Sequence, residues 1–151
     1  GGGAVRIEAT GSMTIDGTVT ANGGNGWGAG WGVGGGGWGG AIYMTCASFG
    51  GTTNGIMRAN GGNGTVVAES ASGGGGGGRI AIWIGISEGR RNQYLAGNPG
   101  IVILADSYKN YFGTAAATNG TGWTNIPPDS AEVGTVRFFT LPGGGSILIL
   151  R

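Results

Sequence analysis

The sequence predicts an all-β, glycine-rich and repetitive fold, either a β-solenoid (β-helix-like) or a stacked-sheet architecture, with polyglycine-II-like segments as a further option. Glycine supplies 40 of the 151 residues, whereas ordinary proteins contain roughly 7%. The thirteen Ile and eight Val outnumber the five Leu, and fourteen Thr accompany them. This composition favours pleated sheet over helix. No segment shows an apolar stripe with the helical period.

An internal repeat organises the first part of the chain. The segment GGAVRIEA begins at Gly2, GGAIYMTC at Gly39 and GGRIAIWI at Gly77, so the offsets are 37 and 38 residues. The hexapeptide ANGGNG occurs at Ala21–Gly26 and again at Ala59–Gly64, 38 residues later. Two independent markers with one period indicate stacked structural units.

Each unit is expected to contain strands joined by turns. We expect the Asn-Gly pairs of the hexapeptides to supply positive φ angles for tight turns. The third unit opens with Ile at alternate positions from Ile80 to Ile86, which predicts a strand with one aliphatic face. The other strands expected in the units are Val5–Ala9, Met13–Ala21, Ile42–Cys46 and Ile56–Ala59.

The stretch Gly26–Gly34 has a second alternation. Its even positions are all Gly, and its odd positions carry Trp27, Ala29, Trp31 and Val33. This pattern predicts one extended strand with a bare backbone face and an aromatic face. Polyglycine-II-like helices are the alternative, above all for Gly73–Gly78.

The chain is expected to form a single domain, with a repeat region at residues 1–88 and a degenerate β continuation at residues 89–151. In the second part we expect strands at Ile101–Ala105, Val136–Thr140 and Ile147–Leu150, and a polar loop at Asn110–Thr124. Arg90 and Arg91 are expected in a solvated turn. The apolar terminal strand, formed by Ile147, Leu148, Ile149 and Leu150, is a candidate assembly strand because an exposed apolar edge invites association.

The double-glycine strand starts, the ANGGNG hexapeptides and the glycine run before GRIAI resemble the glycine-rich repeat regions of large bacterial surface and secreted proteins. The matching residues are Gly2–Ala9, Ala21–Gly26, Gly39–Cys46, Ala59–Gly64 and Gly73–Ile84. The resemblance implies a parallel β-helix-like or adhesin-like architecture and an extracellular or cell-surface location. It implies no catalytic residues.

The chemistry expected of an enzyme has few candidates in this sequence. The chain contains no His, which is the commonest general base and metal ligand. We therefore expect no catalytic residues, no metal site and no cofactor. A paired-carboxylate site from Glu8 and Asp16 is the remaining alternative. The single Cys46 is expected to be a buried apolar side chain.

Charge and hydropathy bear on the partners. The formal net charge is +1 and charged residues make up 10% of the chain, so nucleic acid is not an expected partner. No apolar run approaches the ~20 residues of a membrane-spanning helix, so membrane insertion is not expected.

Three functions remain open. The first is a structural subunit of an extracellular fibre or surface layer, because contacts with identical neighbours would offset the cost of ordering so many glycines. The second is an adhesin or phage-type receptor-binding module that recognises glycans through Trp27, Trp31 and Trp38, although burial of these aromatic rings between sheets is favoured. The third is ice binding by a face that carries Thr14, Thr18 and Thr20.

Overall fold

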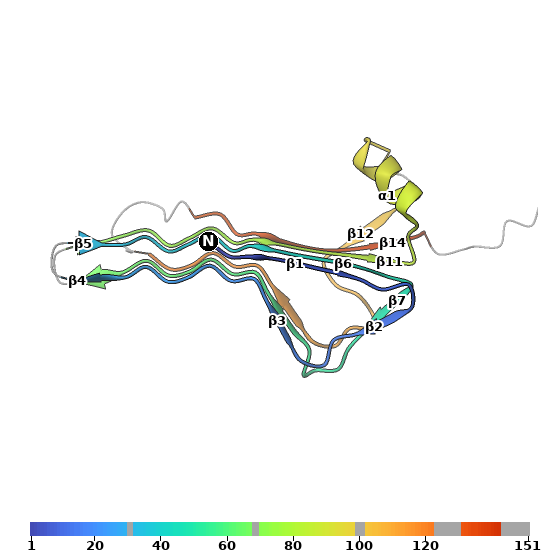
Figure 1. The fold of residues 1–151 in the computed structure, drawn as a ribbon, viewed down its shortest axis with the longest axis horizontal. Helices are drawn as coiled ribbons and strands as arrows, with labels where there is room; N and C mark the ends of the chain where they lie inside the picture. Colours follow the sequence, from blue (N-terminus) through green and yellow to red (C-terminus); the bar gives the residue numbers. More distant parts are fainter. Residues whose placement is uncertain (30–31, 68–69, 99–101, 123–130, 143–151) are drawn as a thin grey trace, which may run out of the picture.

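The computed structural model of the chain describes residues 1–29, 32–67, 70–98, 102–122 and 131–142. Figure 1 shows an elongated molecule. In its narrow part, the arm, glycine-rich segments run side by side, and the wider part, the body, holds the larger sheets and the helix. The regular structure of the described residues consists of strands and one short helix. The prediction of an all-β class is therefore confirmed.

The repeat of the sequence is the pairing register of the main sheet. This five-stranded sheet has the order β1–β6–β11–β14–β12, and its first four strands are parallel. Ala4 pairs with Ala41, Ala41 with Arg79, and Arg79 with Thr135. The first two offsets, 37 and 38 residues, equal those of the sequence repeat. The strands are β1 (Ala4–Glu8), β6 (Ala41–Cys46), β11 (Arg79–Ile84), β14 (Thr135–Thr140) and the antiparallel β12 (Ile103–Ala105).

Two smaller parallel sheets complete the body. One has the order β13–β8–β3, with strands Thr114–Ala116, Ile56–Arg58 and Thr18–Thr20, and the other pairs β2 (Ser12–Thr14) with β7 (Ser48–Gly50). The single strand expected at Met13–Ala21 is wrong, because this segment contains both β2 and β3. The Oδ1 atom of Asp16, between the two strands, accepts a hydrogen bond from the Thr52 N–H at 2.6 Å. The chain therefore changes sheets at this polar residue.

The third unit carries an insertion. Thr135 follows Arg79 by 56 residues, which is 56 − 38 = 18 more than the preceding offset. The insertion accommodates α1 (Glu88–Leu95) and β12. The helix was not predicted, because none of its residues is buried and it therefore shows no apolar stripe. Arg90 and Arg91 lie in α1 and not in a turn.

The polar loop expected at Asn110–Thr124 is also wrong. It contains β13, which pairs with β8, and Tyr111, which is buried in the main core. The repeat therefore continues beyond the insertion, although its sequence no longer shows it.

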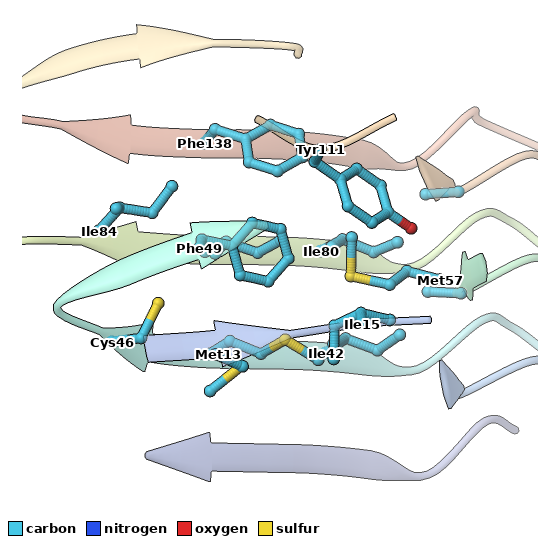
Figure 2. Close-up of a cluster of buried hydrophobic side chains, with 14 of the residues drawn as sticks. Met13, Ile15, Ile42, Cys46, Phe49, Met57, Ile80, Ile84, Tyr111 and Phe138 are labelled. Carbon is cyan, nitrogen blue, oxygen red and sulfur yellow. The ribbon is translucent and has the colours of Figure 1, made fainter. Parts of the chain in front are cut away.

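The main core lies between the five-stranded sheet and the two smaller sheets (Figure 2). Met44 of β6, Ile82 of β11 and Met57 of β8 have no exposed surface. Phe138 of β14 packs against Phe49 of β7, with 6.1 Å between ring centroids. Burial of each such side chain stabilises the fold by roughly 1.5–3 kcal/mol. Cys46 is buried in the same cluster, as predicted.

The aliphatic face expected from Ile80 to Ile86 is confirmed for Ile80, Ile82 and Ile84, which are buried in the main core. It ends there, because β11 ends at Ile84 and Gly85 has a positive φ, and Ile86 is buried in a different cluster. The opposite face of the sheet carries a second cluster of Trp83, Ile86, Val102 and Phe139. The Trp83 and Phe139 rings stack with centroids 3.9 Å apart. Tyr94 of α1 meets Trp83 edge-on at 5.6 Å, which attaches the helix to the body.

Two short hairpins lie in the arm. The strands β4 (Gly28–Ala29) and β5 (Gly32–Val33) are antiparallel, as are β9 (Val66–Val67) and β10 (Ser70–Ala71). The single strand expected over Gly26–Gly34 is therefore wrong. The alternation of Gly with larger residues runs through two antiparallel strands, β4 and β5, instead of one.

Candidate assembly edge

The arm is built from two layers of extended segments. Residues 21–26, 59–64 and 117–122 form the outgoing layer, and residues 34–40, 72–78 and 131–134 form the returning layer. Figure 1 shows these two bands of nearly parallel traces. Within the outgoing layer the Gly23 N–H donates to the Asn60 carbonyl at 2.8 Å. Between the layers the Gly62 N–H donates to the Gly37 carbonyl at 2.8 Å.

The hydrogen bonds of an inner segment repeat every three residues. In residues 59–64 the N–H groups of Asn60, Gly61 and Gly62 donate to three different neighbours, and Asn63 and Gly64 begin the same cycle again. The acceptors for these five donors are, in order, Asn22 Oδ1, the Thr118 carbonyl, the Gly37 carbonyl, Asn25 Oδ1 and the Thr121 carbonyl. The ordered glycines therefore find their hydrogen bonds within the molecule.

The turns expected at the Asn-Gly pairs of the two hexapeptides are wrong, whereas Asn54, which precedes Gly55, does lie in a turn. Among the described residues, only Gly85 and Gly97 have positive φ, and neither belongs to a hexapeptide. Glycine is needed in the arm for close approach of backbones. A β-carbon at Gly62 would lie less than 3.0 Å from the carbonyl oxygen of Gly24, a separation that excludes any side chain.

The asparagines link each unit to the next. Asn22 Oδ1 accepts from the Asn60 N–H at 2.8 Å, and Asn60 Oδ1 accepts from the Thr118 N–H at 3.1 Å. Three residues along, Asn25 Oδ1 accepts from Asn63 and Asn63 Oδ1 from Thr121, each at 2.9 Å. We call these two rows the asparagine ladder.

The first unit ends the ladder at an open edge. Among the described residues, no hydrogen-bond partner is found for the backbone N–H and C=O groups of Asn22 and Asn25. The strands β1 and β3 are the outermost strands of their sheets on the same side. We call β1, β3, residues 21–26 and the glycines between them the first-unit edge.

Three glycines of this edge have free space around them. A β-carbon at Gly3, Gly17 or Gly24 would meet no atom within 4 Å. The residues that follow them in register, Gly40, Gly55 and Gly62, would each place a β-carbon less than 3.0 Å from a backbone oxygen of the first unit. The oxygens that these β-carbons would strike are the carbonyl oxygens of Gly3, Ile15 and Gly24, respectively.

At the other end of the main sheet, β12 covers part of the last parallel strand, β14. Strand β12 pairs antiparallel with β14 over Phe138 to Thr140. Its direction differs from that of the other four strands, so it ends the parallel series. The parallel series is therefore open at β1, whereas at β14 it is covered over these three residues by the antiparallel β12.

The predicted aromatic site is only partly assembled. Trp27 is 82% exposed and Trp38 is 76% exposed, so the expectation that they are buried is wrong. Trp38 lines a groove of about 610 Å³ together with Arg79 and Glu132, whereas Trp27 does not. Trp31 lies outside the described residues, as do Ile147, Leu148, Ile149 and Leu150. Thr14, Thr18 and Thr20 are all exposed.

The acidic residues are engaged separately. Glu8 pairs with Arg6 at 2.9 Å, and the hydrogen bonds that Thr52 gives to Asp16 lower the pKa of that carboxyl. The described part of the chain contains no cluster of three or more residues suited to hold a metal ion. Burial raises the pKa of the Cys46 thiol.

No known family model, curated protein or solved structure matches this chain. No helix among the described residues has the length and apolar character needed to cross a membrane.

Proposed function

We propose that the chain is a structural subunit of an extracellular fibre or surface layer. In this proposal its repeat units form a β-solenoid-like stack with polyglycine-II-like segments in the arm. Copies associate through the first-unit edge, where open strands and bare glycines are both available. The extracellular location follows from the resemblance to surface-protein repeats.

The hydrogen-bond cycle of the arm supports the polyglycine-II-like description. An extended helix with three residues per turn makes no hydrogen bonds within itself and directs its N–H groups outward. Residues 59–64 follow this pattern, with three successive donors bonded to three neighbours. Such a segment requires neighbours on all sides. Residues 59–64 have them within the molecule, whereas residues 21–26 lack them on the open side among the described residues, which favours lateral association there.

The observation that carries the proposal is the difference between the two ends of the parallel series in the main sheet. Strand β1 is the open end of the parallel series, whereas the antiparallel β12 covers part of β14 at the other end of that series. An uncovered edge presents unpaired N–H and C=O groups that pair readily with another chain. Side chains such as Arg6 project from the sheet faces and leave this edge accessible.

The test is the state of association of the purified chain. Light scattering across a wide concentration range is expected to show a rising mass, and electron microscopy is expected to show fibres or layers of regular width. In the β1 segment the odd-numbered residues turn their backbone groups toward β6, because the Ala9 N–H donates to the Thr45 carbonyl and the Gly3 carbonyl accepts from the Ala41 N–H. The variant Ala4→Pro therefore removes a backbone donor from the open side of the edge strand and should reduce the assembly. A chain that stays monomeric at high concentration contradicts the proposal.

The exposure of Trp27 and Trp38 favours glycan binding as a second candidate function. Flat aromatic rings stack on sugar rings, and an exposed Trp beside a groove is suited to that contact. Trp38→Ala should abolish binding on a glycan array and leave assembly intact. Trp83→Ala is not a suitable control because Trp83 lies in the second cluster; the exposed Phe112→Ala serves instead.

A further inference from the structure

We infer that the first-unit edge binds a parallel, glycine-rich coil that carries Asn at two positions three residues apart. The inference names the partner of the edge described above and so rests on the proposed function. The chain's own residues 1–26 have the required sequence.

The first observation behind the inference concerns the glycines of the first-unit edge and their counterparts in the later units. In each later unit a glycine at the same register position is required, because the carbonyl of the preceding unit occupies the place of its side chain. The series Gly40, Gly78 and Gly134 shows this at one level of the stack, and Gly62 and Gly120 show it at another.

Gly3 and Gly24 occupy the same positions in the first unit, yet nothing within the molecule requires them to be glycine. Glycine costs about 0.5–1 kcal/mol relative to alanine in an ordered segment. Gly17 is a third instance, since its counterparts Gly55 and Gly113 would both strike backbone oxygens. A coil docked at the edge supplies the missing reason, because its carbonyl oxygens would take the place of these three side chains.

The unpaired polar groups specify the partner. The Asn60 carbonyl accepts from the Gly23 N–H, and the Asn60 N–H donates to the Asn22 carboxamide. The equivalent carbonyl and N–H of Asn22 are free at the edge, and so are those of Asn25. A docked coil must therefore provide backbone donors and two carboxamide acceptors, with a three-residue separation between the two carboxamides.

The direction of the docked coil follows from the way in which the units of the chain pair with one another. In the main sheet the second, third and fourth units each pair in parallel with the unit before them, so a coil that extends this series beyond the first unit is also parallel. A parallel coil reproduces the register in which Ala4 pairs with Ala41. An antiparallel coil would not place both carboxamides opposite the N–H groups of Asn22 and Asn25.

The experiment uses the full chain and a synthetic peptide of residues 1–26 with a fluorescent label. We expect the peptide to bind the chain in a fluorescence anisotropy titration. A peptide with Asn22→Ala and Asn25→Ala should bind at least about tenfold more weakly, since two hydrogen bonds are lost. Equal binding of the two peptides would overturn the inference, and so would no binding at millimolar peptide.

A variant of the chain locates the binding site. Gly24→Val places a branched side chain at the edge, where its β-carbon has no atom of the folded chain within 4 Å, and should weaken peptide binding at least about tenfold. Gly73→Val is the matched control, because a β-carbon there also meets nothing within 4 Å and Gly73 lies in the returning layer. Circular dichroism checks that both variants fold. Equal binding of the peptide to both variants contradicts an edge site.

The result of the peptide-binding experiment can be distinguished from the result of the self-assembly test of the proposed function. A monomeric chain that binds the peptide in this way refutes self-assembly and supports the inference. A chain that assembles with Gly24→Val as well as without it supports self-assembly and refutes the inference.

Discussion

The carboxamide oxygen of Asn22 accepts a hydrogen bond from the backbone N–H of Asn60 at 2.8 Å, across 38 residues of sequence. A side chain of one unit thus satisfies a main-chain donor of the next. Asn60 repeats the contact toward Thr118. The 38-residue spacing of the two hexapeptides is therefore a spacing of contacts between units, and it does not mark turns.

The first prediction concerns this ladder. Asn60→Ala removes the acceptor of the Thr118 N–H, and we expect it to lower the free energy of unfolding by about 0.5–1.5 kcal/mol. Chemical denaturation measures the change. Asn54→Ala is the matched control, because Asn54 is exposed and its side chain makes no hydrogen bond among the described residues. Equal losses for the two variants would show that the ladder contributes nothing.

The second prediction compares two glycines of one register position. Gly62→Ala places a methyl group against the Gly24 carbonyl, and we expect it to destabilise the fold by at least about 2 kcal/mol. Gly24→Ala meets no atom and its φ is not positive. It should therefore stabilise the monomer by about 0.4–1 kcal/mol, because the unfolded chain loses conformational freedom. Thermal unfolding distinguishes the two, and the close-packing account is wrong if their midpoints shift alike.

The body was predictable where apolar periodicity is strong. The starts of β1, β6 and β11 follow directly from the repeated double glycines, and β14 lies within one residue of its expected range. Less and more buried side chains alternate along β1 and over the first four residues of β6 and β11, so a period of two identifies these strands without knowledge of their partners.

The remaining features depend on contacts that local sequence does not encode. The three N–H directions of residues 59–64 are set by neighbours 25 or more residues away. The pairing of β13 with β8 follows an insertion that hides the repeat. Tyr94 is the one residue of helix α1 that packs against the second cluster, so the sequence of the helix shows no apolar stripe. The open edge is a property of the stack and becomes visible only once the units are placed.

The third prediction tests the core. Phe138 is 1% exposed and its ring lies 6.1 Å from those of both Phe49 and Tyr108. Phe138→Ala should destabilise the fold by about 3–5 kcal/mol through lost burial and the cavity left behind. Phe112→Ala, at a site 69% exposed, should change the free energy of unfolding by less than about 0.5 kcal/mol. A small loss for Phe138→Ala would mean that the body does not depend on this cluster.

The fourth prediction is a pH dependence at the turn between β2 and β3. The Thr52 N–H and hydroxyl hydrogen-bond to Asp16, and they lower the pKa of its carboxyl in the folded chain. The contact therefore contributes stability above the unfolded pKa of about 3.9, and the contribution is lost as the pH falls through the folded pKa. NMR titration of Asp16 should give a lower pKa in the folded chain than in urea. Thr52→Val removes the hydroxyl and keeps the N–H, so the folded pKa should rise only part of the way. The same pKa in both states would show that Thr52 does not hold the carboxylate in solution.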